Sequence, residues 1–144
     1  MNTTIYKQVN TLAESLMEAV EQEDQANFDK DYAQLLQICE EHEGTDKDHP
    51  AQWEALADFT GELDLAIAIY DKALIKAEAI DSIDFCSSIG FSIGAMKLEL
   101  DDKKGAIESL EKAKVACEDI EDKELKAEIH NLLTELTAAR RSVH

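Results

Sequence analysis

The residues best suited to chemistry are concentrated between Glu40 and His49. Two histidines and five carboxylates fall within these ten positions, and both groups are common ligands of divalent metals. Their spacing matches neither the His-Glu-x-x-His zinc motif nor a calcium-binding loop. We therefore interpret the segment as a helix end followed by a solvated acidic loop, and we predict no metal ligand. A metal site that converges from the helix end and the loop is the alternative.

The three cysteines are the other candidates for chemistry. Cys39, Cys86 and Cys117 are an odd number, lie far apart, and include no Cys-x-x-Cys pair. Each falls on or near an apolar helical stripe, which favours small buried thiols in a reducing compartment. The sequence also has no nucleophile elbow, glycine-rich phosphate loop or zinc-knuckle spacing. We predict no catalytic residue and no cofactor, hence a protein that is not an enzyme.

An acidic composition restricts the partners of the chain. Its 144 residues include 14 Lys and Arg against 32 Asp and Glu, a net charge of −18, and the run from Glu21 to Asp48 alone holds ten acids and two lysines. Such a charge favours basic partners and disfavours direct binding to nucleic acid or anionic membranes, although solubility alone is the simpler interpretation. We expect a cytoplasmic protein, because neither a signal peptide nor 18 consecutive apolar residues can be recognised.

Apolar periodicity predicts seven helices and hence an all-α domain over residues 1–144. Gly44 and Gly61 end two of the helices, and Pro50 suits the first turn of the third. Ser82, Asp102 and their acidic neighbours are suitable N-caps. The predicted helices cover residues 4–22, 26–43, 50–60, 63–80, 83–100, 103–119 and 122–141.

Pairs of alanines recur at a fixed interval of 40 residues, which is typical of stacked helical repeats. The pairs are Ala26 and Ala33, Ala66 and Ala73, and Ala106 and Ala113, and Leu35, Ile75 and Val115 align at the same interval. We expect these alanines to let neighbouring helices approach closely. The period predicts hairpins at about residues 4–43, 49–80 and 83–120. The last helix, about 122–141, is then a cap over the open end of the stack.

The central and third units resemble the tetratricopeptide repeat family. The stretch from Trp53 to Leu74 contains a small-residue first helix, a Gly-Glu-Leu-Asp turn, Ala-Ile, an aromatic residue four positions after the alanine, and Ala-Leu. In the third unit Leu110 replaces the aromatic residue, and the 40-residue interval is similar to that of a long-repeat subgroup. The resemblance implies a right-handed superhelical stack of about three hairpins with a capping helix. It also implies a protein- or peptide-binding scaffold or adaptor.

The same resemblance implies which residues face the inner, concave surface of the stack. These partner-binding candidates are Ser15, Glu18, Ala55, Asp58, Phe91, Ala95 and Leu98. The set is small, apolar and mildly acidic, and it lacks the lysines and asparagines with which some family members hold a C-terminal carboxylate. The expected partner is therefore a helix or extended apolar segment with basic flanks. Burial of Phe91 in the core is the alternative.

Two other functions remain open: an acidic regulator that mimics nucleic acid and sequesters a basic protein, and a ligand-sensing or enzymatic helical domain with a closed pocket. We expect a monomer, with weak dimerisation as the alternative. Three expectations concern packing. Gly90 and Gly94 should face a closely packed fourth or sixth helix, Trp53 should be a structural anchor, and deletion of everything after Glu121 should cause aggregation or dimerisation.

Overall fold

The computed structural model describes residues 2–142, which form seven α-helices and no strand. The prediction of an all-α protein is therefore confirmed, and each predicted helix boundary lies within three residues of the observed one. The helices are α1 (Thr3–Glu21), α2 (Gln25–His42), α3 (Pro50–Asp58), α4 (Leu63–Ala79), α5 (Ile83–Glu99), α6 (Lys103–Ala116) and α7 (Lys123–Ser142), with a 3₁₀ turn η1 (Cys117–Asp119) after α6.

The helices begin where the sequence offers a side-chain acceptor for their first N–H groups. Asn2, Asp24, Ser82 and Asp102 each accept a hydrogen bond from the backbone N–H three residues later. The predicted caps Ser82 and Asp102 are thus confirmed. Gly44 follows α2 with φ 78°, in the left-handed region that favours glycine.

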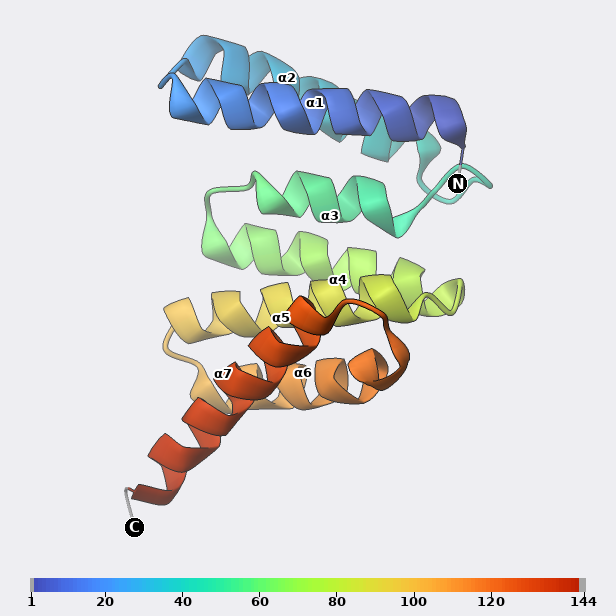
Figure 1. The fold of residues 1–144 in the computed structure, drawn as a ribbon. Helices are drawn as coiled ribbons and strands as arrows, with labels where there is room; N and C mark the ends of the chain where they lie inside the picture. The colour runs from blue at the N-terminus through green and yellow to red at the C-terminus, as the bar shows by residue number, and fades with distance from the viewer. Residues whose placement is uncertain (1, 143–144) are drawn as a thin grey trace. The chain divides into compact units, whose positions relative to one another are not determined.

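The chain divides into two compact units, one extending to Lys76 and the other beginning at Ala77 within α4. We call them unit 1 and unit 2; a single domain over residues 1–144 stays a prediction. In unit 1, α1 and α2 lie side by side and α3 packs against both (Figure 1). The buried side chains of unit 1 include Val9, Leu16, Leu35, Cys39, Trp53, Leu56 and Tyr70.

The alanines of the first predicted repeat, residues 4–43, are not part of the packing. The expected 40-residue interval is therefore wrong for this repeat. Ala26 and Ala33 are exposed, whereas the alanines of the other two pairs are at most 1% exposed. The buried side of α2 carries Asp31 and Leu35, which lie roughly 140–180° around the helix from these alanines. Asp31 and Leu35 precede the buried Ala66 and Tyr70 by 35 residues. An interval of 35 residues therefore relates the buried positions of α2 to those of α4.

In unit 2, two glycines allow α5 and α6 to pack closely. A Cβ atom placed on Gly90 would lie 3.0 Å from Cβ of Ala113, and one placed on Gly94 would lie 2.8 Å from Cγ of Leu110. Both neighbours belong to α6 and are buried. The prediction that the glycines face a closely packed helix is confirmed, and α6 is that helix.

Helix α7 crosses α5 and α6 obliquely and covers the apolar surface that they form in unit 2 (Figure 1). Ile129 is fully buried with Cys117 and Ile120, and Leu133 and Leu136 pack with Leu110. These contacts join α7 to the hairpin before it through two adjoining apolar clusters. That α7 caps the open end of a stack of hairpins stays a prediction.

Candidate functional site

The acidic segment around residues 40–49 is used for structure. The carboxylate of Asp48 accepts hydrogen bonds from Trp53 Nε1 at 2.8 Å, from Lys76 Nζ at 2.6 Å and from the backbone N–H of Gly44 at 2.9 Å. Burial alone would raise the pKa of Asp48, but these hydrogen bonds outweigh it and hold the pKa below its ordinary value. Asp48 thus joins the loop after α2 to α3 and α4.

Trp53 lies at the centre of this arrangement. Its side chain is 4% exposed, and the ammonium groups of Lys72 and Lys76 lie 4.5 and 5.3 Å from the centre of its ring. Lys72 also forms an ion pair with Glu43 at 2.7 Å. The tryptophan is held by cation–π contacts and by its N–H group. The interpretation of Trp53 as a structural anchor is confirmed.

Replacement of Asp48 with Asn should lower the free energy of unfolding by about 1–3 kcal/mol at neutral pH, because Lys76 and Gly44 lose a charged acceptor. The pKa of Asp48 in the folded protein lies below its ordinary 3.8. The stabilisation is therefore complete above that value and is lost as the pH falls through the folded-state pKa. In urea denaturation, the difference from wild type should shrink below about pH 4. Asp46→Asn in the same loop is the control and should have little effect; an Asp48→Asn difference that persists undiminished in acid would contradict the assignment.

The thiols are poor candidates for nucleophiles. Burial, aided by the negative charge of Asp48, raises the pKa of Cys39 to about 12, and burial also raises the pKa of Cys86 and of Cys117. The thiolate is the reactive form, so these groups stay protonated at neutral pH. Across residues 2–142 no three His, Cys, Asp or Glu side chains converge as a metal site.

Three of the seven predicted binding residues are turned towards the second helix of their own hairpin. Ser15 donates a hydrogen bond to Asp31 of α2, and Asp58 accepts one from the Tyr70 hydroxyl of α4 at 2.5 Å. Asp58 as a whole residue is exposed, but its carboxyl group is partly desolvated. This desolvation raises the pKa of Asp58, although the hydrogen bond from Tyr70 acts to lower it. Phe91 is half-buried against both apolar clusters of unit 2. These side chains already have intramolecular partners.

The other four predicted residues differ in exposure. Glu18 is exposed and accepts a hydrogen bond from Gln22, Ala55 and Ala95 are half-buried, and Leu98 packs against the cluster that contains Leu133. Ser15 and Glu18 were placed by the 40-residue interval, which the buried side of α2 in the same hairpin does not follow. The partner-binding role of all seven residues stays a prediction.

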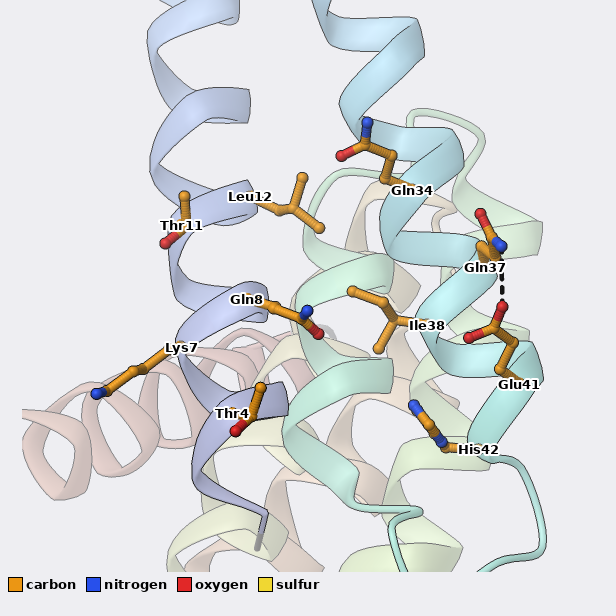
Figure 2. Close-up of a pocket in the computed structure, with 10 residues that line it drawn as sticks. All are labelled: Thr4, Lys7, Gln8, Thr11, Leu12, Gln34, Gln37, Ile38, Glu41 and His42. Atoms are coloured by element: carbon orange, nitrogen blue, oxygen red, sulfur yellow. Dashed lines mark hydrogen bonds between the residues drawn. The ribbon is translucent and has the colours of Figure 1, made fainter.

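A surface groove of about 610 Å³ lies between α1 and α2 in unit 1. Gln8 and Leu12 of α1 point across it towards Ile38 of α2, while the Lys7 side chain points away from α2 (Figure 2). On the α2 side, Gln37 donates a hydrogen bond to Glu41 at 2.9 Å. The ten residues that line the groove are Thr4, Lys7, Gln8, Thr11, Leu12, Gln34, Gln37, Ile38, Glu41 and His42.

The lining combines an apolar floor with amide and hydroxyl groups. Leu12 and Ile38 are half-buried, and three glutamines and two threonines stand around them. Lys7 and Glu41 carry opposite charges, so the groove is close to neutral in a chain of net charge −18. Amide side chains both donate and accept hydrogen bonds. The groove can therefore bind a ligand whose backbone is polar but uncharged and which carries an apolar side chain.

None of the seven residues predicted from the sequence lines the groove. Its glutamines and threonines are spaced three or four residues apart on two helices, and on each helix alone they resemble an ordinary solvated side. Only the pairing of α1 with α2 brings the two rows together.

Comparison of the chain with models of known protein families, with curated proteins and with solved structures gives no match in any of the three. Within residues 2–142, each helix is too short or too polar to cross a membrane.

Proposed function

We propose that this chain is a non-catalytic binding module of the tetratricopeptide-like type, whose hairpins stack in a right-handed superhelix. In this proposal it holds a short segment of another protein in the α1–α2 groove. The observation that carries the proposal is the lining of the groove, with Leu12 and Ile38 at its floor and Gln8, Gln34 and Gln37 around them. Peptide N–H and C=O groups need partners of both kinds, which amides supply.

The size of the groove supports a short segment. Its walls run from Thr4 to Leu12 and from Gln34 to His42, about 12 Å at the rise of an α-helix. That length accommodates about four residues of an extended chain. Seven of the ten lining residues are exposed, which favours a segment laid on the surface over a small molecule held in a closed pocket.

The acidic-regulator alternative has weaker support. Asp24 caps α2, Asp31 accepts a hydrogen bond from Ser15, and Asp48 is bonded to three groups. Three of the ten acidic residues between positions 21 and 48 are therefore engaged within the fold. Direct binding of nucleic acid or an anionic membrane is disfavoured by the net charge of −18.

The proposal is tested with peptides selected from a random library on the immobilised protein. Thr11→Trp fills the groove without removing a buried side chain, and Asn10→Trp places the same bulk on the neighbouring exposed position outside it. We expect Thr11→Trp to weaken binding of the selected peptides about tenfold or more, because the indole occupies the groove. The double change Gln34→Ala with Gln37→Ala should weaken binding to a similar extent, because each lost hydrogen bond is worth roughly 1 kcal/mol. Isothermal titration calorimetry measures the change. Failure to select any peptide, or equal losses for Asn10→Trp and Thr11→Trp, would reject the groove as the binding site.

A further inference from the structure

Helix α1 exposes three large apolar side chains away from the α1–α2 groove. Tyr6, Met17 and Val20 are 49%, 57% and 59% exposed. At about 100° per residue they lie within an arc of roughly 60°, and they span about 21 Å along the helix. Met17 and Val20 are neighbours on this side of the helix, and Tyr6 lies about 16 Å before Met17 along the helix axis. We call these three residues the apolar stripe.

The stripe ends at a depression of about 370 Å³ beside the turn between α1 and α2. Val20 belongs to both, so the two features are continuous. Phe28, which forms one wall, stacks on Tyr32 and meets Phe59 edge to face. These ring contacts fix the wall, and the depression is large enough for one apolar side chain. Its lining residues are Ala19, Val20, Glu23, Asp24, Gln25 and Phe28.

Acidic residues flank the Met17–Val20 end of the stripe and line the depression. Residues 10–24 contain five carboxylates and no lysine or arginine. Glu14 and Glu21 are exposed on α1, and Glu23 and Asp24 line the depression. An apolar surface flanked by carboxylates is complementary to a partner that is apolar in its centre and basic at its edges.

Glu23 is placed beside the depression by the end of helix α1. Its φ is 55°, in the left-handed region, and Asp81 and Asp101 have the same geometry after α4 and α5, with φ of 53° and 63°. A left-handed residue at this position is a common way for a helix to end. The turn therefore positions Glu23 at the lining of the depression.

We propose that the apolar stripe and the depression bind a basic amphipathic helix of another protein. The apolar side of that helix lies along Met17 and Val20, and one large apolar residue enters the depression. Its lysines and arginines pair with Glu14, Glu21 and Glu23. This is the helix-in-groove mode of recognition, read through residues one turn apart, and methionine adapts well to such partners. An anionic membrane or a second copy of this acidic chain would be repelled by the same carboxylates.

The proposal is independent of the α1–α2 groove and is tested with a 15-residue peptide of leucine and lysine whose leucines lie on one side of a helix. The comparison peptide has the same composition with its leucines spread around the helix. At about 0.15 M salt, where exposed charges are partly screened, we expect the amphipathic peptide to bind at least tenfold more tightly by fluorescence anisotropy. Equal binding of the two peptides would show attraction by charge alone and would overturn the proposal.

Variants locate the site. Met17→Glu and Val20→Glu change exposed side chains and should each weaken the amphipathic peptide about tenfold or more, and Glu21→Lys with Glu23→Lys should do the same. Ile75→Glu, at an apolar side chain of unit 1 that is 68% exposed, is the matched control and should bind as wild type does. Thermal unfolding by circular dichroism checks that each variant is folded. Equal losses for Ile75→Glu and Met17→Glu, or no binding by wild type, would refute the site. Thr11→Trp should not change the affinity for the amphipathic peptide. The two proposed binding sites are therefore tested independently of each other.

Discussion

A chain that ends after Glu121 is expected to lose the cooperative unfolding of unit 2 and to associate. The deletion removes α7, which buries Ile129 completely and Leu133 and Leu136 almost completely against α5 and α6. Burying one such side chain contributes about 1.5–3 kcal/mol, so the three together amount to a large part of the 5–15 kcal/mol that stabilises a typical domain. The exposed cluster around Leu110 would then favour aggregation or dimerisation.

Size-exclusion chromatography with light scattering, together with urea denaturation, measures this loss. A chain that ends after Ala138 is the matched control, because it is also shortened but keeps Ile129, Leu133 and Leu136. Ile129→Ala in the full chain should lower the free energy of unfolding by about 2–5 kcal/mol, through lost burial and the cavity left behind. If the chain that ends after Glu121 is a monomer with wild-type stability, α7 does not protect the hairpin.

Enlarging either glycine of α5 is expected to destabilise unit 2, although the same change would strengthen an isolated helix. Alanine at Gly90 gains about 1 kcal/mol in helix propensity, but its Cβ would lie 3.0 Å from that of Ala113, which cannot move without its backbone. Valine at Gly94 is worse, because the fully buried Leu110 is already 2.8 Å from the first added atom. We expect Gly94→Val to cost about 1–3 kcal/mol, or more if α5 and α6 must separate.

A double-mutant cycle separates packing from propensity. Ala113→Gly should be less harmful when Gly90→Ala is also present than in the wild type, because each change then compensates the other; the coupling should be about 1 kcal/mol. Gly61→Ala is the control. Gly61 has no atom within 4 Å of an added Cβ and is not in the left-handed region, so this change should be neutral or slightly stabilising. Chemical denaturation gives all the free energies, and additive changes at Gly90 and Ala113 would show that the two residues do not meet.

Local features made the helices predictable from the sequence. A cap such as Asp102 bonds to an N–H only three residues away, and Pro50 acts within its own turn. Two glycines one turn apart in an apolar helix also predict a close neighbour, because nothing else compensates their cost. These effects need no knowledge of the remainder of the chain, and the structure agrees with them.

Tertiary pairing decided the features on which the proposed functions depend. The alanine interval of 40 residues is a property of the sequence, but a regular spacing does not say which side of α2 meets its neighbours. Asp31, an unfavourable residue for burial, is buried because Ser15 of α1 bonds to it, while Ala26 and Ala33 face solvent.

An acidic, all-helical chain and the ends of its helices thus follow from composition and from neighbours along the chain. The sequence also predicted a close neighbour for Gly90 and Gly94, but only the folded structure identifies that neighbour as α6. Only the folded structure shows that Phe91 is half-buried against the apolar clusters of unit 2 and that Leu12 and Ile38 form the floor of a groove. Both outcomes depend on how one helix is rotated against another. That rotation is set by the sum of many side-chain contacts, which no single segment contains.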